Sequence, residues 1–171
     1  MRLSHLNSLL FGLCLVPLAS SAMDIQPGLW EISSSNMQVD GQALPGMQQM
    51  LEQMKNMPPE QRQMMEQMLA KQGVQLGDKG VRMCISVAQI AAQELPLQDP
   101  KSGCSHEVTE RTDTLWKFRF SCPDSQGEGE TRFLGDKEFT SQVRATHGGQ
   151  SSSMESHAHW VGADCGALQP R

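Results

Sequence analysis

The sequence predicts a mainly β domain, in which a curved antiparallel meander sheet or partial barrel carries an inserted Met/Gln-rich helical hairpin. Two observations favour this fold class. Short segments that alternate apolar and polar residues follow one another from residue 104 to residue 162, with turn residues between them. Near the start, a segment of about 47–73 has apolar residues at the spacing of a helix instead.

The first strand is entered at Pro27–Gly28, and it places Trp30 and Ile32 on one face. The links between the later strands are too short for crossover helices, so neighbouring strands are expected to pair antiparallel. Alternation places all three tryptophans on apolar faces, which is typical of a sheet with one face on the core. The further strands are predicted at 80–85, 104–110, 115–122, 128–134, 138–147 and 154–162.

The inserted segment predicts two helices, about 47–56 and 59–72. Pro58–Pro59 separates them, because proline lacks the N–H that a helix interior needs. We expect this hairpin to cover one face or the mouth of the sheet. Farther along, Ser86 and Gln89 have the spacing of a capping box and predict a short helix before Pro96.

Residues 1–22 have the three parts of a secretory signal peptide. Arg2 precedes an apolar run from Leu9 to Leu18, and small residues lead to Ala22. The run is about half of the roughly 20 residues that cross a bilayer, so we expect cleavage and a single antiparallel β domain, 23–171. Cleavage would remove one positive charge and change the net charge from −5 to −6, which disfavours nucleic acid as a partner. The expected location is the periplasm, with secretion as second choice.

Four cysteines remain after that cleavage, and no two are closer than 18 positions, which disfavours a zinc site. An even number in an exported chain predicts two disulfides. A turn centred on Asp113 sets Cys104 opposite Cys122, which leaves Cys84 and Cys165 as the second pair. Three connectivities are possible, and this register favours Cys104–Cys122 with Cys84–Cys165.

Four short motifs occur in order along the mature chain. They are Pro27–Glu31 (PGLWE), Met57–Arg62 (MPPEQR) at the second helix, Cys84–Ile85 before the short helix, and Gly162–Cys165 (GADC). Together they resemble the bacterial secreted family catalogued as domain of unknown function 3617. The resemblance covers nearly the whole mature chain, and it implies a Gram-negative periplasmic setting and an antiparallel sheet with a helical insertion. It implies no established activity and therefore no catalytic residues.

The methionines of the hairpin are the most distinctive side chains. Flexible thioethers suit helix packing or an adaptable surface for a ligand or partner, formed by Met50, Met54, Met64, Met65 and Met68. Thioether sulfur is also a soft ligand for Cu(I). The alternative interpretation is therefore a copper site formed by Met50, Met54, Met64 and Met68 with His157 and His159.

No catalytic constellation is recognised, and no cofactor is expected. His106 is predicted to point inward beside Phe120 as a hydrogen-bonded core histidine, whereas His157 and His159 lie on a polar face. A histidine without a nucleophile motif does not make a triad. The sequence therefore favours a non-catalytic periplasmic binding or envelope-associated module, with an apolar small molecule, a lipid or an envelope protein as partner. A Met-rich copper-binding protein is the alternative, and an unrecognised enzyme is the least favoured one.

Overall fold

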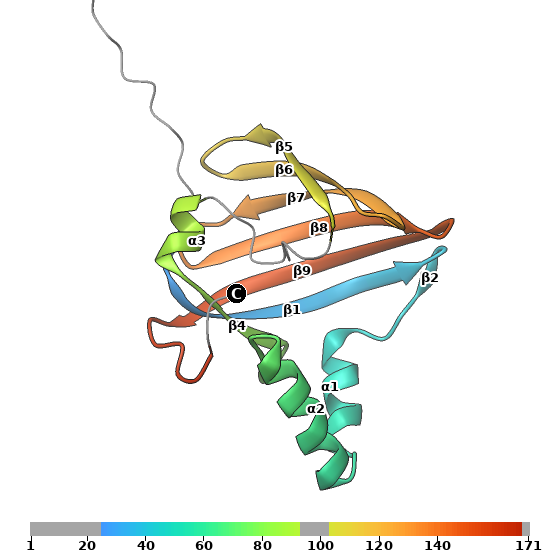
Figure 1. Ribbon diagram of the computed structural model, residues 1–171, viewed down its shortest axis with the longest axis vertical. Coiled ribbons are helices and arrows are strands. Elements are labelled where there is room, and N and C mark those ends of the chain that lie inside the picture. Colours follow the sequence, from blue (N-terminus) through green and yellow to red (C-terminus); the bar gives the residue numbers. More distant parts are fainter. Residues whose placement is uncertain (1–24, 93–102, 169–171) are drawn as a thin grey trace, which may run out of the picture.

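The computed structural model describes residues 25–92 and 103–168, so the predicted signal peptide lies outside the described residues. The chain forms one open antiparallel sheet in the order β3-β4-β1-β9-β8-β7-β6-β5, with β2 beside β1 (Figure 1). The strands are β1 Gly28–Val39, β2 Gln42–Ala43, β3 Val74–Leu76, β4 Val81–Ile85, β5 Ser105–Arg111, β6 Leu115–Ser121, β7 Ser125–Phe133, β8 Glu138–His147 and β9 Gln150–Gly162. The helices are α1 Met47–Lys55, α2 Pro59–Lys71 and α3 Val87–Ala92.

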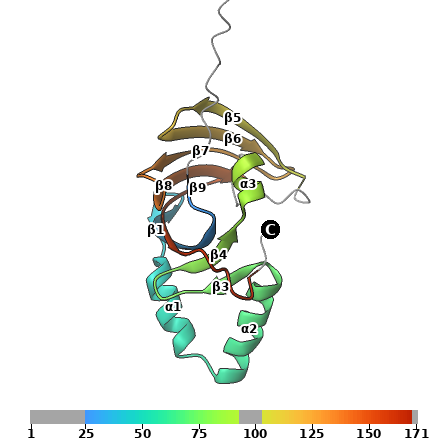
Figure 2. The ribbon, with the colours of Figure 1, turned by 90° about the vertical axis from the view of Figure 1, so that its left-hand side faces the viewer.

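The predicted fold class is confirmed, since strands β5 to β9 form an antiparallel meander and the helical segment is inserted before it. Figure 2 shows the sheet curving from β5 through β9 and β1 to β4 and β3. Two strands were not predicted, β2 with two residues and β3 with three. Such short pairings carry too few alternating residues to stand out in the sequence.

One face of the sheet carries the hydrophobic core, and we call it the core face; the opposite one is the outer face. Trp30 and Trp116 are buried, and Trp30 contacts Phe139 with ring centroids 5.2 Å apart. Phe133 joins the two halves of the cluster, 5.3 Å from Trp116 and 6.0 Å from Phe139. Trp160 is only partly buried but packs against the same cluster, so all three tryptophans contribute to the core, as predicted.

The Pro27–Glu31 motif closes the end of the core. The indole N–H of Trp30 donates to the carbonyl of Gln26 at 2.9 Å, and that of Trp160 donates to the carbonyl of Pro27 at 3.1 Å. Gly28 adopts φ +130°, and a Cβ there would collide with the backbone of Gly162. This position therefore requires glycine for its conformation and for the close approach of the C-terminal strand.

The last residue of the motif, Glu31, is a buried acid on the outer face. Its carboxylate accepts hydrogen bonds from the backbone N–H of Lys79 at 2.7 Å and from Arg82 Nε at 2.8 Å. Gly77 lets the β3–β4 turn close over this carboxylate, because a Cβ at Gly77 would lie 2.7 Å from it. Burial raises the pKa of Glu31, but these hydrogen bonds and the charge of Arg82 outweigh burial and leave that pKa lowered.

The helical hairpin has the predicted break, since α1 ends before Pro58 and α2 begins at Pro59. Its expected position over the sheet is wrong. The helices project from the sheet, with α1 against β1 and α2 against β3 (Figure 1). The physical reason is the shortness of the links, because residues 44–46 and 72–73 tie the hairpin to strands at this end of the sheet.

The predicted capping box opens α3. Gln89 N–H donates to Ser86 Oγ at 3.1 Å, and the Gln89 side-chain oxygen accepts from the Ser86 N–H at 2.9 Å. This reciprocal pair satisfies N–H groups that have no partner inside the helix. The helix places Ile90 against the core.

Two cysteine pairs lie at disulfide distance, with S–S separations of 1.97 Å for Cys84–Cys165 and 2.02 Å for Cys104–Cys122. They are the pairs that the strand register favours. The first ties β4 to the segment after β9, and the second ties the start of β5 to the end of β6.

Digestion of the oxidised protein without reductant should release Cys84 joined to Cys165 and Cys104 joined to Cys122. Replacing Cys84 and Cys165 by serine should lower the free energy of unfolding by about 4.5 kcal/mol. Replacing Cys104 and Cys122 by serine should lower it by about 3 kcal/mol. The longer closed loop restricts the unfolded chain more. Chemical denaturation measures both losses, and a peptide joining Cys84 to Cys104 would contradict the pairing.

Glu31→Gln should lower the free energy of unfolding at neutral pH by about 2 kcal/mol, because Arg82 loses a charged acceptor. A lowered folded-state pKa stabilises the protein above the unfolded pKa of about 4.3, and this contribution is lost as pH falls through the folded value. The difference between wild type and variant should therefore shrink as the pH is lowered below about 4. Glu138→Gln, whose side chain is 47% exposed, is the matched control and should cost far less.

Candidate ligand-binding face

The two faces of the sheet differ sharply in charge. Strand alternation and register place every glutamate of the strands on the outer face: Glu31, Glu107, Glu110, Glu128, Glu130, Glu138 and Glu155. Among the described strand residues, the core face carries no aspartate or glutamate. The outer acids pair with basic neighbours, as Lys117 does with Glu110 at 2.6 Å and Arg132 does with Glu130 at 3.0 Å.

The core face is filled at one end and open at the other. The buried aromatic cluster occupies the end near Gly28, whereas the apolar side chains toward the β8–β9 turn remain partly exposed. Val108 is 39% exposed, and its register neighbours Phe118, Val143 and Met154 are half-buried. We call this region the open half, formed by Val108, Phe118, Phe120, Gly127, Gly129, Val143, Ala145 and Met154.

Two glycines flatten the floor of the open half. Gly129 faces Phe118 across the β6–β7 pair, and Gly127 faces Phe120. A Cβ on Gly129 would lie 2.6 Å from the Phe118 ring, so the ring lies across the glycine. This arrangement covers the glycine backbone with an aromatic ring and leaves a broad apolar strip across the sheet.

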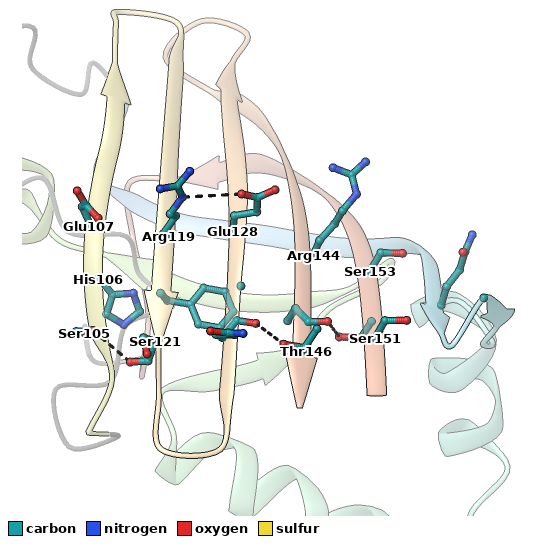
Figure 3. Close-up of a pocket in the computed structure, with 17 residues that line it drawn as sticks. Ser105, His106, Glu107, Arg119, Ser121, Glu128, Arg144, Thr146, Ser151 and Ser153 are labelled. Atoms are coloured by element: carbon teal, nitrogen blue, oxygen red, sulfur yellow. Dashed lines mark hydrogen bonds and ion pairs between the residues drawn. The ribbon is translucent and has the colours of Figure 1, made fainter. Parts of the chain in front are cut away.

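A shallow cavity of about 860 Å³ lies at the far end of this region. Its walls are three consecutive rows of paired residues on strands β5 to β9, as Figure 3 shows, with Gln38 and Gly41 beside them. The middle row belongs to the core face and contains His106, Phe120, Gly127, Ala145 and Ser152. A flanking row contributes alternating charges, with Arg119 Nε 3.9 Å from Glu128.

Arg111 lies at the boundary between the filled and the open ends. Its guanidinium carbon is 4.4 Å from the centre of the Trp116 ring, which is a cation–π contact. Its Nε is buried and has no hydrogen-bond partner among the described residues. The same row continues across the sheet through hydroxyl groups, including Thr131 and Ser141, whose oxygens lie 2.7 Å apart.

The predicted methionine surface does not border this face. Met64 and Met68 are 66% and 59% exposed on α2, and Met50, Met54 and Met65 are half-buried on the hairpin. The hairpin contacts β1 and β3, far along the sheet order from β5 to β7. A role of these methionines in holding a partner stays a prediction.

The histidines lie in different surroundings from the methionines. His157 Nε2 is 2.7 Å from Glu138 Oε1 on the outer face, and His159 stacks beside His157 with ring centroids 6.3 Å apart. Strand β1 separates their strand from the hairpin that carries Met50, Met54, Met64 and Met68. Within the residues that the structure describes, no group of three or more His, Cys, Asp or Glu side chains could hold a metal ion.

The expectation for His106 is half right. It pairs with Phe120, as the register predicted, but its side chain is exposed rather than buried. No described element buries the core face at this position, so His106 points to that face and is still exposed.

Arg111 is the residue that the sequence analysis missed. An unbroken register places Arg111 opposite Leu115, on the outer face. A bulge after Val108 shifts the pairing by one residue, so Arg111 pairs with Trp116 and points to the core face. No residue pattern marks this bulge.

No helix in the described ranges is long and apolar enough to cross a membrane.

Comparisons with known proteins agree with the motifs. The family model described as "Protein of unknown function (DUF3617)" matches residues 25–165. An "Uncharacterized protein in lpd-3 5'region" of Pseudomonas putida is 58% identical over 124 residues, which are 72% of this chain and 87% of that protein. No solved structure matches the chain. The resemblance carried by the four motifs is thus confirmed, and the chain belongs to the DUF3617 family of proteins of unknown function.

Proposed function

We propose that this protein is a non-catalytic binding module of the bacterial periplasm, and that the open half of the core face receives an apolar ligand. The observation that carries the proposal is the incomplete core. The apolar strip that contains Phe118, Val143 and Met154 belongs to the same face as the buried tryptophans, yet it remains partly exposed. Exposed apolar surface that is continuous across several strands is typical of a binding site.

The surroundings of the strip support a binding role. A cavity of about 860 Å³ adjoins the strip and has the size of a small-molecule site. Its walls combine an aromatic ring with hydroxyl, amide and charged groups, which can orient a ligand whose apolar part lies on the strip. The two cysteine pairs support the proposed compartment, because disulfides persist where the environment is oxidising.

An environment-sensitive, uncharged naphthylamine dye should bind the purified protein and fluoresce. Met154→Glu should weaken dye binding tenfold or more, because a carboxylate on the strip would lose its hydration when the dye covers it. The matched control is Leu134→Glu, which introduces the same charge at a 57% exposed position outside the strip and should leave dye affinity unchanged. Fluorescence titration measures both.

Equal affinities for the wild type and the Met154→Glu variant would show that the dye binds elsewhere and would contradict the proposal. Native mass spectrometry of protein purified from periplasm provides the second test. A co-purifying apolar molecule is expected, whereas a bound metal would favour the copper alternative.

A further inference from the structure

We propose that Arg111 binds the carboxylate of a single-chain amphiphile whose apolar chain lies along the open half of the core face. This inference rests on the proposed function, because it names the chemical class of ligand for the same face. Three independent observations carry it: the state of the Arg111 side chain, the distribution of charge on the sheet, and the order of polar and apolar rows.

The Arg111 side chain contacts an aromatic ring, but its Nε has no hydrogen-bond partner within the described ranges. The guanidinium carbon lies 4.4 Å from the centre of the buried Trp116 ring, and this cation–π contact holds the side chain at the ring. Its buried Nε makes no hydrogen bond to any residue that the structure describes, and an unpaired buried donor is costly. The residue as a whole is only half-buried, and the terminal Nη groups of a guanidinium can donate two parallel N–H bonds to a carboxylate.

The distribution of charged side chains on the two faces favours an anionic ligand for the core face. On the outer face, Lys117, Arg119 and Arg132 each lie within 4.0 Å of a glutamate oxygen. In the part of the chain that the structure describes, Arg111 has no acidic partner, and its face carries no strand acid. The protein as a whole is acidic, with a net charge of −5, so a positive group on an acid-free apolar face is a local exception.

Residues that pair side by side across the strands form rows on the core face, and the sequence of polar and apolar rows fits an amphiphile with its head at Arg111. Beyond Trp116, the row of Arg111 continues with the hydroxyls of buried Thr131 and half-buried Ser141, which bond to each other, so this row is more polar than the next two. The next two rows toward the open end carry Phe118 and then Phe120, which extends the apolar strip by about 13 Å beyond Trp116. One guanidinium balances the single charge of a carboxylate, whereas a phosphate monoester brings about −1.5 to −2.

The test compares decanoate with decanol as competitors of the naphthylamine dye on the full-length mature protein. Decanoate should bind about tenfold more tightly than decanol to the wild type, because only the carboxylate can pair with Arg111. Arg111→Gln should remove this preference and leave decanol affinity unchanged. The matched control is Arg132→Gln, which removes the same charge from the outer face, where Arg132 is 55% exposed, and should keep the preference.

Other results of the competition experiment would contradict either the carboxylate assignment or the proposed function. If both probes bind equally to the wild type, or if Arg111→Gln weakens both equally, the carboxylate assignment is wrong while the apolar site stands. If neither probe displaces the dye, the proposed function fails as well. Tighter binding of decyl phosphate than of decanoate would contradict the choice of head group. Should Arg111→Gln fail to fold, Arg111→Lys must show a reduced preference, since an ammonium lacks the planar fork.

Discussion

The aromatic cluster fills only one end of a long sheet, and the rest of the molecule follows from this constraint. With three tryptophans, five phenylalanines and no tyrosine, the chain has few large side chains to bury. The three tryptophans gather with Phe133 and Phe139 at one end of the core face, and Ile25 and Ile90 complete the cluster there. Strands of up to 13 residues extend beyond the cluster, and the described helices and loops do not fully bury the apolar positions there. The open half is therefore the part of the core face that the buried cluster does not reach.

The segments before β1 and after β9 are both bonded to the domain beside the buried aromatic cluster. The carbonyl of Gln26 accepts a hydrogen bond from the indole N–H of Trp30, and that of Pro27 accepts one from the indole N–H of Trp160. The second bond joins the segment before β1 to the last strand, β9. The Cys84–Cys165 pair reinforces the same end. On the outer face, the Glu31 carboxylate joins β1 to β4 and to the β3–β4 turn, because it accepts hydrogen bonds from Arg82 and from the backbone N–H of Lys79. The PGLWE motif thus has a structural explanation, in which each of its last two residues anchors a different side of the sheet.

Charge segregation gives the open half its chemical character. Glutamates and most basic residues alternate on the outer face, where they pair and remain solvated. The core face retains apolar groups, hydroxyls and a single arginine at the boundary of the filled region. The apolar strip itself therefore carries no strand acid, and Glu107 and Glu128 of the outer rows approach it only at the cavity. The helical hairpin contributes no residue to the open half, and Met64 and Met68 are exposed on α2.

The sequence by itself determined every described strand except β2 and β3, and most of the strand faces. It also determined the break of the hairpin at Pro58–Pro59, the cap at Ser86 and the register that brings Cys104 opposite Cys122. These features are local, because they depend on alternation, proline chemistry and short turns. Only the tertiary structure decided where the hairpin lies, that Glu31 is buried, that His106 is exposed, and that Arg111 faces the core side. A one-residue bulge moves each side chain beyond it to the opposite face of the sheet. No residue type in the sequence indicates the bulge after Val108. Burial likewise depends on which distant segment covers a residue, and that is settled only when the whole sheet has formed.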